Sequence, residues 1–257
     1  MTIAEVAGRS IYYEVTGDGE PVVLLHGGLS GADAWVGQVP ALVAAGMRVW
    51  VPERSGHGHS PDHDGPFSYE DMAEETAAFL DAVVGERAHL VGWSDGAVVG
   101  ALVARHRPEL VDRLVLIGQY FDSTGEVEGG LVGQLVGLRD NPPAFLSSVY
   151  AAVSPDGVEH FPVVFAKTVD MVADWSGVEL AELAKISAPT LVLQGDRDEV
   201  RLEHSAAVAT AIPDARLAVL PGTHAIPLES PQMVNSLLID FLRGGPKTFD
   251  WTASANH

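Results

Sequence analysis

Short runs of consecutive apolar residues recur along the chain, and each run ends in a polar or glycine-rich loop. The runs lie at residues 22–25, 49–51, 89–91, 114–117, 191–193 and 217–220. Because they are continuously apolar and do not alternate with polar residues, they predict strands covered on both faces, as in a parallel sheet. Residues 11–15, which precede a Gly-rich turn at 16–19, predict an earlier strand that lies antiparallel at an edge.

Segments with a helical spacing of apolar residues lie between the predicted strands. The clearest runs from residue 69 to 84, with acidic residues in its first turn and Ser68 as its N-cap. Others lie near residues 94–106, 203–211 and 231–242. Strands that alternate with helices predict an α/β fold, a mostly parallel open twisted sheet flanked by helices.

One stretch breaks this alternation. Between the run that ends at residue 117 and the one that begins at 190 there is no convincing strand, and residues 150–153, 161–172 and 178–183 have helical character. We interpret the stretch as a helical lid over the C-terminal edge of the sheet. The predicted organisation is a core at 1–121, the lid at 122–187, the rest of the core at 188–245 and a C-terminal tail at 246–257.

Composition narrows the class of protein. A chain of 257 residues with 47% hydrophobic content is large enough for one substantial α/β core. A net charge of −20 argues against nucleic acid or an anionic membrane as a partner. The chain has no cysteine, no apolar run long enough for a membrane span and no signal-peptide pattern at its N-terminus. We therefore expect a cytoplasmic enzyme or binding protein, and the sequence does not set its oligomeric state.

The most informative residues are Gly92-Trp93-Ser94-Asp95-Gly96, between a predicted strand and an apolar helix. A serine at such a turn, with glycine two residues to either side, is the nucleophile-elbow pattern. The turn forces the serine into a strained conformation, and a side chain at either glycine would collide with the neighbouring strand or helix. The pattern predicts a serine hydroxyl that is presented for nucleophilic attack.

Other polar residues follow the predicted strands at their carboxyl ends, where open parallel sheets form their sites. Along the chain the order is serine, then aspartate, then histidine. With these motifs the chain resembles the α/β-hydrolases over nearly its whole length, and its elbow is similar to that of biphenyl-hydrolase-like serine esterases. The matching motifs are His26-Gly27-Gly28, Arg54-Ser55-Gly56-His57-Gly58-His59-Ser60, the elbow, Gly195-Asp196-Arg197-Asp198 and Gly222-Thr223-His224.

Each catalytic role has a candidate. A serine hydroxyl needs a general base, for which His224 is the candidate, and the base needs a carboxylate to orient it. The resemblance places that carboxylate at Asp198; Asp196, which we expect to structure its loop, and Asp122 are the weaker alternatives. An oxyanion hole needs two N–H donors, and the resemblance supplies them from the backbone of Gly28 and Asp95.

Further residues allow more than one interpretation. The carboxylate of Asp95 either interacts with the helix dipole or binds a cationic group of the substrate, and Trp93 and Phe121 are further candidate substrate contacts. Five residues resemble metal ligands on paper, but we expect a solvated loop and no metal there; they are His57, His59, Asp62, His63 and Asp64. Glu53 stands where this family usually has aspartate, and the sequence gives it no function.

The predicted function is that of a cofactor-independent and metal-independent serine hydrolase. Its substrate is a small molecule with an ester, thioester, lactone or similar acyl bond. Carbon–carbon bond hydrolases, perhydrolases and lyases use the same triad, and a non-catalytic small-molecule receptor on this scaffold is the alternative outside enzymes. A serine nucleophile argues against the dehalogenase and epoxide-hydrolase branches, which use aspartate at the elbow.

Overall fold

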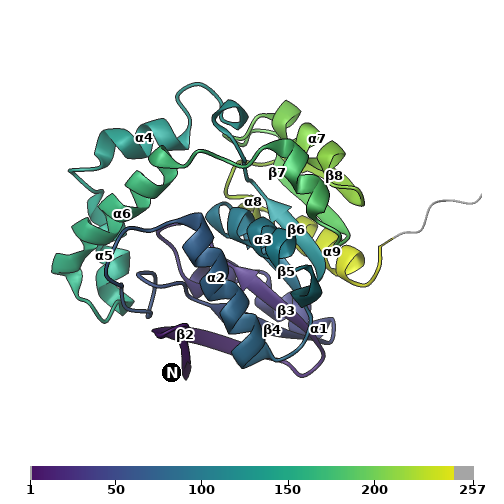
Figure 1. Cartoon of the computed structure of the whole chain (residues 1–257), viewed down its shortest axis with the longest axis horizontal. Coiled ribbons are helices and arrows are strands. Elements are labelled where there is room, and N and C mark those ends of the chain that lie inside the picture. The colour runs from purple at the N-terminus through teal and green to yellow at the C-terminus, as the bar shows by residue number, and fades with distance from the viewer. Residues whose placement is uncertain (1, 246–257) are drawn as a thin grey trace, which may run out of the picture.

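A single sheet organises the molecule. The computed structural model describes residues 2–245, and within them eight strands pair in the order β1-β2-β4-β3-β5-β6-β7-β8 (Figure 1). β1 and β2 are antiparallel to their neighbours, and the other strands are parallel. The strands are β1 Thr2–Val6, β2 Arg9–Thr16, β3 Glu20–Leu25, β4 Met47–Pro52, β5 Ala88–Trp93, β6 Val111–Ile117, β7 Thr190–Gly195 and β8 Ala215–Leu220.

The predicted α/β fold is confirmed, including the antiparallel strand at residues 11–15. β1 was not predicted, because it is a short edge strand in which only Val6 is buried. Its backbone pairs with β2 at the margin of the sheet, where burial imposes little pattern on the side chains.

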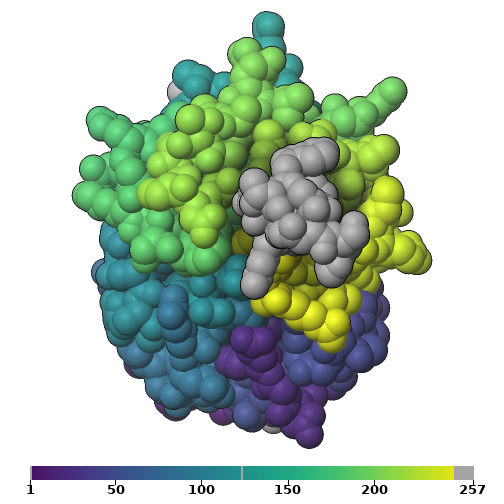
Figure 2. Space-filling model, turned by 90° about the vertical axis from the view of Figure 1, so that its right-hand side faces the viewer, coloured from purple at the N-terminus to yellow at the C-terminus, as the bar shows by residue number. Residues whose placement is uncertain are grey.

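Helices cover both faces of the sheet. Leu90 of β5 packs in a cluster with residues of α2 Tyr69–Phe79, α3 Asp95–His106 and α7 Leu202–Ala211. The next residue, Val91, points to the other face and packs with residues of α1 Val39–Ala44 and α9 Pro231–Leu242. Adjacent residues of one strand are therefore both buried, which explains the continuous apolar runs. Figure 2 looks onto the side of the molecule that α9, in yellow, covers.

Short elements complete the core. These are η1 Ala32–Trp35, the π-turn η2 Leu80–Val84 that extends α2, η3 Pro108–Leu110 and α8 Ile226–Glu229. Ser68 caps α2 as predicted, since its side chain accepts a hydrogen bond from the amide of Asp71. No helix within residues 2–245 is long and apolar enough to cross a membrane.

Helices occupy the chain between β6 and β7 and stand beside the sheet in Figure 1, and their role as a lid stays a prediction. The elements of this helical insertion are η4 Ser123–Gly125, α4 Leu131–Leu138, α5 Ala144–Val153, η5 Val158–His160, α6 Phe161–Asp174 and η6 Leu180–Lys185. The pattern at 161–172 marked α6, whereas α4 was not predicted. The segment at 178–183 is largely 3₁₀ helix. The proposed tail at 246–257 lies outside the described residues.

Candidate active site

Ser94 occupies a strained turn between β5 and α3. Its φ of 56° and ψ of −123° lie outside the regions that non-glycine residues normally adopt. A Cβ on Gly92 would overlap the carbonyl oxygen of Gly96, and a Cβ on Gly96 would overlap that of Leu25 at the end of β3. Both flanking positions therefore require glycine for steric reasons, as the sequence predicted.

The structure brings Ser94, His224 and Asp198 together. The Oγ of Ser94 lies 3.0 Å from Nε2 of His224, and Nδ1 of His224 lies 2.9 Å from Oδ1 of Asp198. The three side chains come from the ends of β5, β8 and β7, and Gly195 pairs with Leu220 where β7 and β8 end. The parallel sheet thus delivers residues 130 positions apart to one edge.

Asp198 is itself held in place. Its Oδ1 accepts a second hydrogen bond, at 3.1 Å, from the backbone N–H of Val200, and its side chain is fully buried. By contrast, Asp196 accepts from the amide of Gly222 at 2.9 Å and so ties two loops together, the role expected for it. Asp122 accepts from the amide of Thr124 and has no contact with His224.

The protonation of His224 reflects two opposing effects. Burial alone would lower its pKa, but the hydrogen bond and the negative charge of Asp198 outweigh burial and raise the pKa above its usual value. Glu199 and Asp95 act in the same direction as Asp198. The ring is therefore well suited to accept a proton from Ser94 and to hold it while negative charge develops nearby.

Gly28 and Asp95 lie next to one another at the edge of the sheet where β3 and β5 end. A Cβ on Gly28 would overlap Oδ2 of Asp95, so the two residues are in close approach. Asp95 is the first residue of α3, where backbone N–H groups have no partner within the helix. Its Oδ1 accepts a hydrogen bond from the Tyr69 hydroxyl at 2.6 Å, and burial together with this carboxylate raises the pKa of Tyr69 well above its usual value.

The chain is similar to known proteins over most of its length. Residues 20–156 match the family model described as the alpha/beta hydrolase fold. The chain belongs to the α/β-hydrolase fold family. It is 32% identical over 255 residues to a protein from Variovorax paradoxus named as a carbamate hydrolase, RutD, covering 90% of this chain and 96% of that one. It is 26% identical over 257 residues to human serine hydrolase BPHL, covering 95% and 87%.

Solved structures agree with this assignment. A hydrolase from Pseudomonas aeruginosa is 26% identical and superimposes with a TM-score of 0.76 over 94% of this chain and 97% of that chain. The relatives support an enzyme of the hydrolase class. The chain is thus an α/β-hydrolase whose sheet edge carries a serine, a histidine and two aspartates.

Gly118 is a residue of this hydrolase that sequence reasoning missed. It follows β6 with a φ of +59°, and a Cβ there would lie 2.9 Å from Oδ2 of Asp198 and 3.0 Å from Nδ1 of His224. Any larger residue would press on the aspartate–histidine pair. The signal available in the sequence was a glycine directly after a buried strand, which is common in such sheets and therefore not distinctive.

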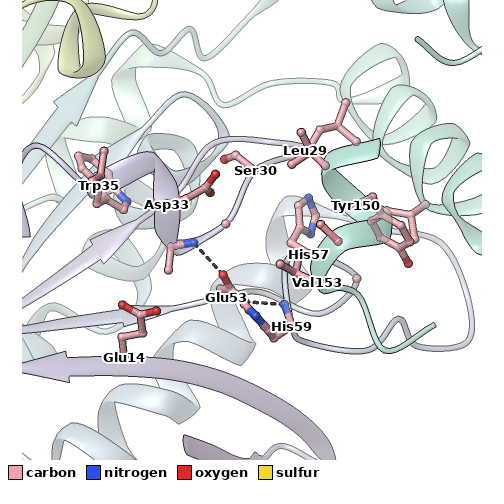
Figure 3. Close-up of a pocket in the computed structure, with 18 of the residues that line it drawn as sticks. Glu14, Leu29, Ser30, Asp33, Trp35, Glu53, His57, His59, Tyr150 and Val153 are labelled. Atoms are coloured by element: carbon pink, nitrogen blue, oxygen red, sulfur yellow. Dashed lines mark hydrogen bonds and ion pairs between the residues drawn. The ribbon is translucent and has the colours of Figure 1, made fainter. Parts of the chain in front are cut away.

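Glu53, to which the sequence gave no function, braces two loops of the site. Its side chain is 3% exposed, and its Oε1 accepts a hydrogen bond from the amide of Ala32 at 2.8 Å (Figure 3). Its Oε2 accepts from the amide of His59 and lies 3.0 Å from Nδ1 of the same residue. Gly31 packs directly against the carboxylate. Glu53 therefore connects the loop that carries Gly28 to the loop that follows β4.

Arg54 also holds the loop that carries Gly28. Its guanidinium is buried, with Nη2 donating to the carbonyl of Gly27 at 3.1 Å and lying 3.2 Å from Nδ1 of His26. Its backbone N–H donates to Nε2 of His26. Burial lowers the pKa of His26 well below its usual value, so the ring is neutral. His26 therefore has a structural role in this loop.

The other predicted contacts have different environments. Trp93 donates from Nε1 to the backbone carbonyl of His224 at 2.8 Å, which fixes the loop that carries the histidine. Phe121 is 0% exposed and belongs to the apolar core, so its side chain is not accessible to substrate in this conformation. The sequence could not separate core from pocket for this residue.

The loop at residues 57–64 is only partly solvated: His57 and Ser60 are buried, whereas Asp64 is exposed as expected. His57 is buried, and Oδ2 of Asp62 lies 2.7 Å from Nζ of Lys167 and 2.8 Å from Nε2 of His160. Both partners belong to the helical insertion, so this loop ties the insertion to the core. Of the residues that resembled metal ligands, Asp62 forms ion pairs with the insertion, whereas His59 pairs with Glu53 within the core.

Among residues 2–245, two groups have donor atoms close enough together to hold a metal ion. One group, Asp198, Glu199 and His224, overlaps the candidate triad. The other, Glu20, His89 and Asp112, lies where β3, β5 and β6 begin, at the opposite edge of the sheet. Neither group includes a residue of the loop at 57–64.

Proposed function

We propose that this α/β-hydrolase is a cofactor-independent serine hydrolase that cleaves an ester or related acyl bond of a small molecule. The observation that carries the proposal is the continuous series of contacts from Ser94 through His224 to Asp198, with separations of 3.0 and 2.9 Å. These distances allow hydrogen bonds between nucleophile and base and between base and carboxylate, the geometry that acyl transfer requires.

The reaction would proceed in two halves. In the first, Oγ of Ser94 attacks the carbonyl carbon while Nε2 of His224 takes the hydroxyl proton. The tetrahedral intermediate collapses, the proton passes to the leaving oxygen, and an acyl-enzyme remains. In the second half, His224 removes a proton from water, which attacks the acyl-enzyme and releases the acid with Ser94 restored.

Two backbone amides would stabilise the oxyanion. The N–H groups of Gly28 and Asp95 are the donors in this proposal, and Glu53 and Arg54 hold the loop that carries Gly28. The negative charge of the Asp95 carboxylate would by itself disfavour an oxyanion close to it. The Tyr69 hydroxyl, which donates a hydrogen bond to this carboxylate, and the positive charge of buried Arg54 both reduce that repulsion. Because Oδ1 of Asp95 already accepts from Tyr69, Oδ2 is the atom that would meet a cationic substrate group.

A carbamate is the second candidate substrate, because of the 32% identity to the protein named as a carbamate hydrolase. A carbamate has the same carbonyl for Ser94 to attack and a nitrogen next to it. The two classes can be separated by supplying p-nitrophenyl acetate and p-nitrophenyl carbamate to the same preparation. Faster release of p-nitrophenol from the carbamate would favour this class over a simple ester.

The test of the proposed function is p-nitrophenyl ester turnover by the wild type and by Ser94→Ala. Ser147→Ala, a change of the same type in α5, is the matched control. We expect Ser94→Ala to lose at least about 10³-fold in kcat, as loss of a nucleophile does, while the control keeps wild-type activity. Folded Ser94→Ala that retains wild-type turnover would refute the assignment of the nucleophile.

A further inference from the structure

A second carboxylate lies beside the pair formed by His224 and Asp198. Glu199 directly follows Asp198, and a carboxylate oxygen of Glu199 lies within 4.8 Å of a ring nitrogen of His224 and of a carboxylate oxygen of Asp198. Its Oε2 is enclosed by protein and has no hydrogen-bond partner among the described residues. A carboxylate oxygen removed from water in this way is stable only if positive charge lies near it. The ring of His224 supplies such a charge when it is protonated.

The backbone of Glu199 is fixed by another segment of the chain. Its carbonyl oxygen accepts a hydrogen bond from the N–H of Val127 at 2.9 Å. Two residues later, the N–H of Arg201 donates to the carbonyl oxygen of Gly125 at 2.8 Å. These bonds fasten residues 199–201 to the loop that begins the helical insertion. Glu199 is therefore held beside the histidine by contacts that are independent of the catalytic residues.

Three carboxylates act on the ring of His224. Burial lowers the pKa of His224, whereas Asp198, Glu199 and Asp95 raise it, with Asp198 the strongest of the three. Asp198 acts through a hydrogen bond of 2.9 Å as well as through its charge, and Asp95 accepts a hydrogen bond from Tyr69. Oε2 of Glu199 accepts no hydrogen bond from the described residues, so its charge is not offset in that way.

We propose that Glu199 is a positioning residue of the reaction, whose carboxylate acts on His224 and stabilises the imidazolium that forms when the ring takes the proton of Ser94. The inference rests on the proposed function. In the step concerned, the O–H bond of Ser94 breaks and its proton moves to Nε2 of His224. The Oγ–C bond to the substrate forms at the same time, and the negative charge passes to the carbonyl oxygen. Positive charge is then on the ring, next to both Asp198 and Glu199.

The closeness of the two carboxylates makes this stabilisation specific to the protonated ring. While His224 is neutral, Asp198 and Glu199 repel one another across less than 4.8 Å. Once the ring carries a positive charge, both carboxylates attract it and their repulsion is offset. An interaction that is more favourable after proton transfer than before it lowers the barrier.

The first test compares pH profiles of kcat/KM for p-nitrophenyl acetate in the wild type and Glu199→Gln. Glu203→Gln is the control, because Glu203 is 79% exposed and pairs with Arg201. For charges this close, we expect Glu199→Gln to lower the midpoint by at least about 0.5 pH, or threefold in the protonation equilibrium. The plateau should fall about 3- to 10-fold. Glu199→Asp, which keeps the charge, should return the midpoint toward that of the wild type.

A purely structural role for Glu199 would lower the rate without moving the midpoint, and that result would overturn the inference. So would an equal change of midpoint in Glu203→Gln. Neither result would affect the assignment of Ser94, which depends on Ser94→Ala.

A double substitution separates direct action on His224 from action through Asp198. If Glu199 acts on the ring itself, Asp198→Asn/Glu199→Gln should be at least about threefold slower than Asp198→Asn, with a lower midpoint. If Glu199 only orients the Asp198 carboxylate, the second substitution has nothing left to disturb. Equal rates and midpoints in Asp198→Asn and the double variant would therefore overturn the inference.

A measurement without turnover keeps this inference distinguishable from the proposed function. The titration of the His224 ring can be followed by NMR through its Cε1–H signal, identified by its absence from His224→Gln. The midpoint should be lower in Glu199→Gln than in the wild type and Glu203→Gln, whether or not any ester is cleaved. Equal midpoints in all three proteins would overturn the action of Glu199 on His224, even if Ser94 proves to be the nucleophile.

Discussion

Replacement of Asp198 by asparagine should change both the rate and its pH dependence. The side-chain amide can take the place of the carboxylate, because Oδ1 accepts from Val200 and lies by His224 while Oδ2 has no hydrogen-bond partner among the described residues. The variant should therefore fold. What it loses is the negative charge that faces the histidine.

The size of the effect follows from the two opposing influences on His224. Its raised pKa depends on Asp198, since burial alone would lower it. His224 must be neutral to act as a base, so wild-type kcat/KM should rise with pH through a midpoint above the usual value of 6.5. In Asp198→Asn the midpoint should move to lower pH. The plateau rate should fall by about 10³- to 10⁴-fold, or about 4–5 kcal/mol, as the imidazolium loses its partner.

The assay is kcat/KM for p-nitrophenyl acetate across pH 5 to 9, with Asp196→Asn as the matched control. Asp196 lies in the same loop but accepts from Gly222 and does not contact His224. The control should keep the wild-type midpoint. An unchanged or higher midpoint in Asp198→Asn, or a loss confined to the control, would refute the assignment of Asp198 as the partner of His224.

Three further substitutions test the supporting structure. Gly118→Ala should lower kcat by at least about tenfold, because its Cβ would lie 2.9 Å from Oδ2 of Asp198. It should also lower the free energy of unfolding by about 1 kcal/mol, because alanine is strained at a positive φ. An unchanged kcat would contradict the role of Gly118. In Glu53→Gln the side-chain N–H₂ would face the backbone N–H of Ala32 or His59, so one hydrogen bond that holds the oxyanion loop would be lost. We expect kcat to fall about tenfold with little change in KM. An effect on KM alone would contradict this role. Asp62→Asn should lower the free energy of unfolding in urea by about 1–3 kcal/mol, because Lys167 and His160 lose the carboxylate that pairs with them. An unchanged unfolding midpoint would show that these ion pairs do not stabilise the protein.

Much of the fold could be predicted because its pattern is local. The strands at the centre of the sheet are buried on both faces, so each appears in the sequence as a short apolar run. α9 spans Pro231–Leu242, the range its apolar spacing predicted. The elbow could be predicted because steric overlap imposes glycine at fixed distances from Ser94.

The remainder depends on contacts between distant parts of the chain. Gly118 matters only because Asp198 and His224, from two other strand ends, occupy the space where its Cβ would be. The role of Glu53 depends on a hydrogen bond from the backbone amide of Ala32, which lies about twenty residues earlier in the chain. α4 escaped prediction because its eight residues, LVGQLVGL, include two glycines, which disfavour a helix.

The central claim is that Ser94 becomes covalently modified during the reaction. The most direct measurement is intact-protein and peptide mass spectrometry after reaction with diethyl p-nitrophenyl phosphate, which transfers a diethylphosphoryl group to an activated serine and releases p-nitrophenol. The account predicts one adduct per chain, located on Ser94, formed in step with loss of esterase activity and absent from Ser94→Ala. Loss of activity with the adduct on another residue would contradict it, and so would full labelling of Ser94→Ala.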